Sequence, residues 1–310
     1  MSTWPELDFA RWKPTSDALH RWLQIVGKYR LANSPWVNHS WHATFYVTPH
    51  GLTTGPIHTP GGAVEWHFDF RTHVLRGISS DAANVELPLT QMSVAEFHER
   101  FVALTRTLNA EVAFHGAPNE VPDPIPFAKD TEARPYEAPE AARFHRALVQ
   151  MDRVFRRFRT SYLGKVSPVH LFWGSFDLAV TRFTGRTAPL HPGGIPALPD
   201  DVAQEAYSHE VSSAGFWAGG NGVDEAMFYS YAYPAPEGFA KASVRPEAAY
   251  FDDNLGEFLL PYRAVREASD PDGALMAFLT STWDAAAKSG DWPVEALECA
   301  TGEARIVRAL

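Results

Sequence analysis

Apolar residues recur at helical spacing in four segments of the chain. The first segment runs from about residue 15 to residue 31, and the others lie near 93–108, 139–160 and 271–288. The buried stripe of the first segment consists of Leu19, Trp22, Leu23, Val26 and Tyr29. Ser93, followed three residues later by Glu96, has the spacing of a capping box and predicts the start of the second helix. The pattern therefore predicts four helices.

Alternation of apolar and polar residues predicts the strands. It favours strands at 41–48, 65–73, 111–115, 168–183, 207–213 and 227–233. Residues 51–62 are rich in glycine and proline and are typical of a turn between the first two strands. Gly174 is expected to shift the strand register within 168–183.

The order of these elements predicts an α+β fold with mostly antiparallel sheets and packed helices. Six prolines within 116–139 predict a crossing segment, which separates a helix-plus-sheet half at 1–115 from a second half at 140–310. Each half repeats the sequence of helix, strands and helix, which indicates two pseudo-duplicated halves of one compact unit.

The stretch from 162 to 187 places charged residues inside an apolar run. Buried charges are costly unless they pair with one another or face a ligand, so this stretch predicts a central polar site. Its ionisable and polar members are Lys165, His170, Ser175, Asp177, Arg182 and Arg186. We expect His170 to be more than half buried, because apolar residues flank it.

The first helix carries a second polar set. His20, Gln24 and Lys28 recur every four residues and therefore share one face. Such a stripe usually faces water. The rest of this helix is apolar on most positions, which favours an inward direction, toward Asp69 or the central stretch.

Composition limits the classes of function. A net charge of -10 in 310 residues disfavours a nucleic-acid partner, which requires a positive surface. The single cysteine, Cys299, excludes an intramolecular disulfide, and no apolar run is long enough for a membrane span. We expect a cytoplasmic protein with no membrane or nucleic-acid partner. Its oligomeric state stays open.

The polar residues named above predict a small-molecule site between the two halves. No motif in the sequence assigns a reaction class to that site. Nucleotide-binding glycine motifs and the nucleophile-elbow motif are missing, so no nucleotide cofactor is expected. Proton transfer is expected from His170, His209, Asp177 and Glu210. A small acidic or aromatic substrate is expected to contact His20, Gln24, Lys28, Asn38, His39, Lys165, Trp173, Arg182 and Arg186.

Two alternatives remain at this point. His67, Asp69, His170 and His209 could supply a histidine and carboxylate set for a divalent transition metal, although no spacing motif supports it. Histidines satisfied by backbone carbonyls are commoner than metal ligands. The same pocket could also belong to a ligand-binding or sensing protein that catalyses nothing.

Several motifs together resemble an uncharacterised bacterial family known only as a domain of unknown function. They are Leu-His-Arg-Trp-Leu-Gln-Ile-Val-Gly-Lys-Tyr-Arg-Leu from Leu19, Asn38-His39, Phe68-Asp-Phe, Ser-Pro-Val-His-Leu-Phe-Trp-Gly-Ser-Phe-Asp-Leu-Ala-Val-Thr-Arg-Phe-Thr-Gly-Arg from Ser167, Tyr-Ser-His-Glu-Val-Ser-Ser from Tyr207 and Phe-Tyr-Ser-Tyr-Ala-Tyr-Pro from Phe228. The resemblance covers nearly the whole chain and implies that it is one family unit. It implies no activity, cofactor or catalytic residue.

Overall fold

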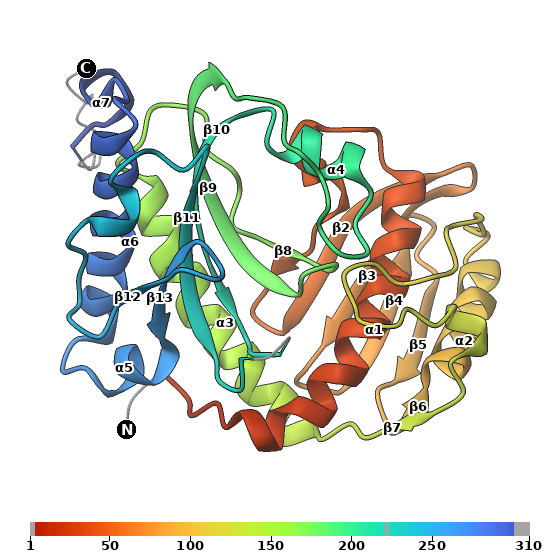
Figure 1. Cartoon of the computed structure of the whole chain (residues 1–310). Coiled ribbons are helices and arrows are strands. Elements are labelled where there is room, and N and C mark those ends of the chain that lie inside the picture. Colours follow the sequence, from red (N-terminus) through yellow and green to blue (C-terminus); the bar gives the residue numbers. More distant parts are fainter. Residues whose placement is uncertain (1–3, 221–222, 301–310) are drawn as a thin grey trace.

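The protein has an α+β fold with antiparallel sheets, as the sequence predicts, namely two large sheets and a two-stranded one (Figure 1). The computed structural model describes residues 4–220 and 223–300. One sheet has the strand order β1-β2-β3-β4-β5, and the other has the order β12-β13-β11-β10-β9-β8. The five-stranded sheet lies within the first half of the chain and the six-stranded sheet within the second.

The first half contains two long helices beside its sheet. Its elements are α1 (Phe9–Asn33), η1 (Asn38–Ala43), β1 (Tyr46–Val47), β2 (Gly51–Thr59), β3 (Gly62–Asp69), β4 (Val74–Ser79), β5 (Asn84–Pro88), β6 (Met92–Ser93) and α2 (Val94–Thr107). The crossing that follows contains η2 (Phe127–Lys129) and β7 (Ala133–Arg134), and β7 pairs with β6.

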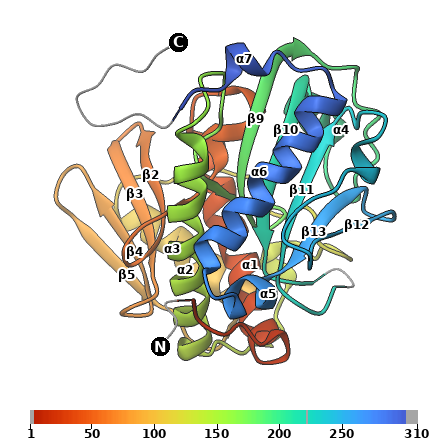
Figure 2. The same ribbon diagram turned by 90° about the vertical axis from the view of Figure 1, so that its left-hand side faces the viewer.

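The second half covers its sheet with α3 and α6. Its elements are α3 (Ala138–Arg159), β8 (His170–Phe172), β9 (Asp177–Thr187), α4 (Asp200–Ala206), β10 (His209–Trp217), β11 (Met227–Tyr233), η3 (Phe239–Lys241), β12 (Tyr250–Asp252), β13 (Glu257–Pro261), α5 (Tyr262–Glu267), α6 (Pro271–Ser289) and α7 (Val294–Leu297). Figure 2 shows α3 and α6 side by side over one face of this sheet. Within the described residues no helix is long and apolar enough to cross a bilayer.

The two sheets meet at one short backbone junction. The Phe45 N–H donates to the Leu171 carbonyl at 2.9 Å, and the Leu171 N–H donates back to Phe45 at 2.8 Å. This reciprocal pair connects the segment before β1 to β8. Residues next to β8 therefore lie where the two halves of the chain meet.

Helix α1 is buried on nearly every side between residues 12 and 30. It contacts α2, α3 and β2, so it belongs to the core of both halves. Gln24 is 0% exposed and Lys28 is 4% exposed, which confirms that the polar stripe faces inward. His170 is 0% exposed, so the expectation that it is buried is also confirmed.

Two strand predictions were wrong, those at 41–48 and 111–115. Residues 38–43 form η1 instead of a strand, because His39 and Ser40 adopt left-handed φ values of 58° and 57°. The Val37 N–H also donates to His42 Nδ1 at 3.2 Å, which closes the turn. Of the predicted strand only Tyr46–Val47 belongs to a named strand, β1, and 111–115 contains no strand.

The glycine- and proline-rich segment after β1 is strand β2 rather than a turn. The pairing of β2 with β3 shifts register between Thr53 and Pro56, and Gly55 has a left-handed φ of 63°. A bulge at this point tolerates a proline within a strand. A side chain at Gly51 would meet the Phe68 carbonyl oxygen at 1.7 Å, so this position requires glycine.

Replacement of Gly27 by alanine should destabilise the protein. An alanine Cβ at this position would lie 2.3 Å from Trp173 Cδ1, and the indole is anchored by a hydrogen bond from its Nε1 to the Ala43 carbonyl. Overpacking costs about 1–3 kcal/mol, which outweighs the gain of about 1 kcal/mol in helix propensity. Urea unfolding of Gly27→Ala should show a loss of stability. The loss should shrink in a Trp173→Ala background, and an equal loss in both backgrounds would contradict the proposed clash.

Candidate functional site

The turn from Trp173 to Asp177 connects β8 to β9 and forms the centre of the candidate site. The Phe176 N–H donates to the Phe172 carbonyl at 2.9 Å, and Phe176 has a left-handed φ of 59°. Residues 168–183, predicted as core strands with a register shift at Gly174, form two paired strands joined by a tight turn at Gly174. This turn directs Ser175 and Asp177 toward the face of the sheet that α3 and α6 do not cover.

His20 of α1 contacts this turn through a hydrogen bond and a ring stack. Its Nε2–H donates to the Gly174 carbonyl at 2.7 Å, and its ring stacks on Phe176 with 5.1 Å between centroids. Burial lowers the pKa of His20 to about 4. The imidazole is neutral at physiological pH, so His20 positions the turn rather than transferring protons there.

Gln24 attaches the proline-rich crossing to α1. Its Nε2 donates to the Asn119 carbonyl at 2.8 Å, and its Oε1 accepts the Asn119 N–H at 2.7 Å. Lys28, one turn further along α1, donates to Asn119 Oδ1 and lies 5.1 Å from the centre of the Trp173 ring. These contacts place Glu120, the next residue, over the hairpin turn.

Glu120 is held close to Gly174. A side chain at Gly174 would lie 2.0 Å from Glu120 Oε1, so the glycine leaves the space that the carboxyl group occupies. Glu120 has a left-handed φ of 53°, and its N–H donates to Ala197 at 3.2 Å. Burial and the nearby Asp177 raise the pKa of Glu120 to about 7, although Lys28 opposes this shift.

Asp177 is the carboxylate that the other groups surround. It is 8% exposed and accepts hydrogen bonds from the Ser175 and Tyr229 hydroxyls. Burial raises the pKa of Asp177, whereas these two donors stabilise its ionised form. The Tyr229 hydroxyl reaches Asp177 because Gly215 has no side chain. A Cβ at Gly215 would lie 2.3 Å from this hydroxyl.

Glu257 supplies a third carboxyl group from β13. It lies two residues before Leu259, the partner of Tyr229, and therefore shares its face of the sheet. Burial and the charge of Asp177 raise the pKa of Glu257 to about 7. Within the described residues, neither Glu120 nor Glu257 receives a hydrogen bond through its side chain.

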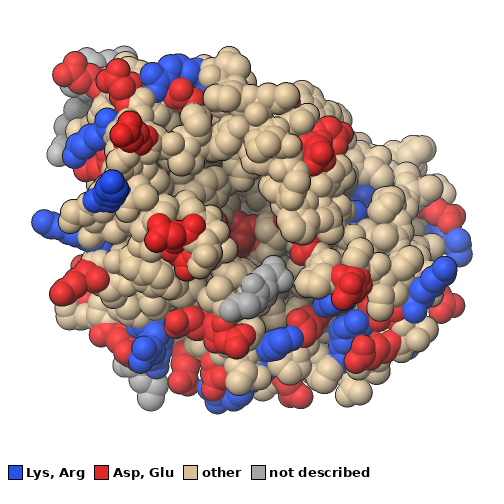
Figure 3. Space-filling view, in the orientation of Figure 1, with Lys and Arg blue, Asp and Glu red and all other residues tan. Residues whose placement is uncertain are grey.

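Tyrosines line the sheet beside these acids. The Tyr229 and Tyr231 rings stack at 6.0 Å, and the Tyr231 and Tyr207 hydroxyls are 3.0 Å apart. Burial raises the pKa of Tyr229 and of Tyr231 well above the ordinary value, so both phenols stay protonated. Figure 3 shows a hollow between the six-stranded sheet and the side of the molecule formed by α1 and α4, with acidic side chains on its floor.

This arrangement is suited to proton transfer. Two carboxyl groups titrate near neutral pH, and both are within electrostatic range of Asp177. Groups with a pKa near the working pH make efficient general acids and bases. The structure brings together six of the predicted residues, namely His20, Gln24, Lys28, Trp173, Ser175 and Asp177.

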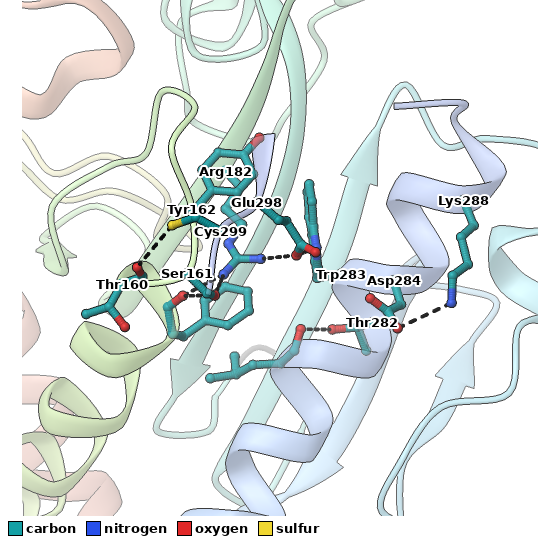
Figure 4. A network of polar contacts seen from close by, with 12 residues as sticks. Thr160, Ser161, Tyr162, Arg182, Thr282, Trp283, Asp284, Lys288, Glu298 and Cys299 are labelled. Carbon is teal, nitrogen blue, oxygen red and sulfur yellow. Dashed lines mark hydrogen bonds and ion pairs between the residues drawn. The ribbon is translucent and has the colours of Figure 1, made fainter. Parts of the chain in front are cut away.

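Arg182 points to the opposite face of the sheet. Its guanidinium carbon lies 3.6 Å from the centre of the Phe158 ring, and the rings of Tyr162 and Trp283 complete an aromatic cage. Arg182 also pairs with Glu298 at 3.4 Å (Figure 4). The prediction that it contacts a substrate in the central site was wrong, because strand alternation turns it toward α3 and α6.

Arg186 and Glu210 also lie outside the candidate site around Asp177. They form an ion pair at 2.8 Å, and Arg186 donates to the Gly290 carbonyl at 2.7 Å. This contact joins the end of β9 to the end of α6. Neither residue is near the hairpin turn.

His170 and His209 do not share a pocket. They lie opposite Ala179 and Thr187 of β9, which are eight residues apart, or about 26 Å at a rise of about 3.3 Å per residue. His170 donates through Nδ1 to the Pro168 carbonyl at 2.6 Å. Its Nδ1–H is therefore satisfied by the backbone, whereas its buried Nε2 has no hydrogen-bond partner among the described residues.

The predicted metal set is not assembled. Asp69 lies in the other sheet, where it accepts the Arg71 and Thr72 N–H groups at 2.9 Å, and His67 Nε2 is 2.7 Å from the Thr48 hydroxyl. Within residues 4–220 and 223–300, no group of three or more His, Cys, Asp and Glu side chains could hold a metal ion. His67 and Asp69 lie on β3 of the five-stranded sheet, whereas His170 and His209 lie on β8 and β10 of the six-stranded sheet.

His39 and Lys165 form a second polar cluster beside α4. Lys165 Nζ lies 2.6 Å from His39 Nε2, and the His39 Nδ1–H donates to the Ala206 carbonyl at 3.0 Å. The His209 ring is 5.9 Å from the His39 ring. Asn38 begins η1 beside them.

Sequence reasoning missed Glu120 and Glu257. Glu120 lies in the proline-rich crossing, whose composition predicts only a connecting segment. Glu257 follows a turn that contains a glycine. The alternation of Tyr229, Tyr231 and Tyr233 was the one visible signal for this face. The contacts that place Glu120 join positions about one hundred residues apart, so no local pattern predicts them.

Replacement of Glu120 by glutamine should change the pH dependence of stability. The folded state retains this proton up to about pH 7, whereas the unfolded chain releases it near the ordinary pKa of 4.5, so stability falls as the pH rises between these values. Glutamine removes this loss. Relative to wild type, Glu120→Gln should gain about 1–2 kcal/mol between pH 5 and pH 8, less than the full shift because the side chain is partly exposed. Glu247→Gln, at an exposed position, is the matched control, and identical pH profiles for both variants would contradict the assignment.

Replacement of Asp177 by asparagine should lower the pKa of both glutamates. The charge of Asp177 contributes to each upward shift, so its removal favours their ionisation. Carbon-detected NMR titration of the side-chain carboxyl groups in wild type and Asp177→Asn would measure this. Unchanged titration of Glu120 and Glu257 would show that Asp177 does not act on them.

Comparison with known proteins agrees with the resemblance that the motifs indicate. A family described as "Family of unknown function (DUF5996)" matches residues 4–299. No curated protein and no solved structure shows a significant match. The match extends over both sheets and the candidate site, and the chain therefore belongs to the DUF5996 family.

Proposed function

We propose that the protein is a small-molecule enzyme whose acid–base groups are Glu120 and Glu257. The observation that carries this proposal is the proximity of three carboxyl groups from distant segments, with Glu120 against the Gly174 turn, Asp177 bonded to Tyr229, and the charge of Asp177 acting on both groups that titrate near pH 7. Such an arrangement destabilises the folded state at neutral pH, and perturbed carboxyl groups of this kind concentrate at functional sites.

Each residue has a distinct proposed role. Ser175 and Tyr229 donate to Asp177 and stabilise its ionised form, whose charge would favour a proton on one or both glutamates. One glutamate then donates a proton to the substrate while the other accepts one. The cationic Lys28 would stabilise negative charge that develops beside Glu120.

The lining favours a neutral or cationic substrate. Three carboxyl groups oppose an acidic ligand, whereas tyrosine faces and hydroxyls suit an aromatic ring or a polyhydroxylated molecule. The aromatic part of the expected substrate class is therefore retained, and the acidic part is less favoured.

A non-catalytic binding protein is the second candidate. The buried, well-bonded tyrosines would serve a rigid binding pocket equally well. The two candidates differ in their need for carboxyl groups that titrate near neutral pH. An acid–base enzyme must transfer protons at that pH, whereas a binding protein need not. The reducing cytoplasm remains the proposed location, because the chain has only one cysteine.

Incubation with a cell metabolite extract should separate the two candidates. Wild-type protein should deplete at least one neutral or cationic metabolite, as followed by mass spectrometry, and Glu120→Gln and Glu257→Gln should lower the rate by about 100-fold or more. The rate should vary with pH around 7, where the glutamates titrate. Glu247→Gln should behave as wild type. Retention of a metabolite without conversion would instead support the binding protein.

A further inference from the structure

A second cluster of reactive groups lies away from the carboxyl groups. Lys165, in the segment between α3 and β8, contacts His39 of η1 and lies 4.8 Å from the centre of the Phe183 ring. Phe183 is six residues from Asp177 along β9, which corresponds to about 20 Å. The cluster is therefore separate from the proposed acid–base site.

The hydrogen bonds fix the tautomer of His39. Its Nδ1–H donates to the Ala206 carbonyl at 3.0 Å, so Nε2 carries the lone pair and accepts a hydrogen bond from Lys165 Nζ at 2.6 Å. The ring is also 4.5 Å from the Phe183 ring, centroid to centroid, and is 3% exposed. A nucleophile bonded to a base that a third group orients is the general arrangement of nucleophilic catalysis.

The surroundings of Lys165 favour its neutral amine. No carboxylate of the described residues pairs with the nitrogen within 4.0 Å, although the rings of Phe183 at 4.8 Å and Trp41 at 5.4 Å attract its cationic form. Burial lowers the pKa of Lys165, although Glu205 opposes this effect. The side chain is nevertheless partly exposed, so a small molecule can reach it.

The backbone around His39 is strained. His39 and Ser40 both adopt left-handed conformations, which are uncommon for residues other than glycine. Strain of this kind persists only where the surrounding structure enforces it, and it concentrates at functional sites. Here it places the imidazole against Lys165.

We propose that Lys165 is a reactive amine that forms a Schiff base with a small aldehyde or ketone, with His39 as its base. His39 Nε2 takes a proton from the Lys165 ammonium, and the freed lone pair of Nζ attacks the carbonyl carbon. The carbonyl oxygen takes up protons and leaves as water, and a protonated C=N bond remains. One ammonium and one carbonyl group give one iminium and one water, so atoms and charge balance.

Reductive trapping tests this directly. Full-length protein is treated with propanal and sodium cyanoborohydride at neutral pH, and peptide mapping by mass spectrometry follows each lysine. Lys165 should be modified roughly tenfold or more faster than the exposed Lys241 and Lys288, which have no such base. Equal rates at the three lysines would overturn the proposal.

The matched variant is His39→Asn. Asparagine tolerates a positive φ, so the turn can persist while the base is removed. The modification rate of Lys165 should fall to that of Lys241, and a rate equal to wild type would exclude His39 as the base. If this variant does not fold, the comparison of the three lysines in the wild-type protein decides the question alone.

Discussion

The buried polar stripe of α1 is the constraint on which the site depends. A polar group that is removed from water must find a partner, and the three side chains of this stripe find theirs in distant segments. His20 bonds to the hairpin turn at Gly174, and Gln24 bonds twice to Asn119. One helix thus fixes the crossing segment and the β8–β9 turn relative to each other. Glu120 and Asp177 are neighbours because of it.

Charged side chains lie on both faces of the six-stranded sheet. The partners of each charged group indicate whether it serves the packing of the fold or the proposed site. On the face toward α3 and α6, Arg182 is enclosed by aromatic rings and bonded to the Phe158 carbonyl at 2.5 Å. On the other face, Glu120 and Glu257 are desolvated without a donor among the described residues. A buried guanidinium that is enclosed by rings and paired with a carboxylate connects the helices to the sheet. A desolvated acid without a donor stores free energy that binding or chemistry can release.

The sequence predicts what local patterns determine. Helical periodicity located α1, α2, α3 and α6, and the inward direction of Lys28 followed from the apolar residues around it. Backbone conformations that break a pattern could not be predicted, such as the left-handed pair at His39 and the bulge near Pro56. The hydrogen-bond partners of a buried residue could not be predicted either. His170 was correctly predicted as buried, but its hydrogen bond to the Pro168 carbonyl and its distance from His209 could not be read from the sequence.

The two lysines beside the six-stranded sheet show how similar groups acquire different roles. Lys28 and Lys165 both lie against aromatic rings, and burial lowers the pKa of each. Lys28 donates to the Asn119 amide oxygen, which cannot accept a proton, and it faces Glu120, so its charge is retained and acts electrostatically. Lys165 donates to an imidazole nitrogen, which can accept that proton. The chemistry open to each lysine therefore follows from its hydrogen-bond acceptor, and only the fold brings that acceptor into place.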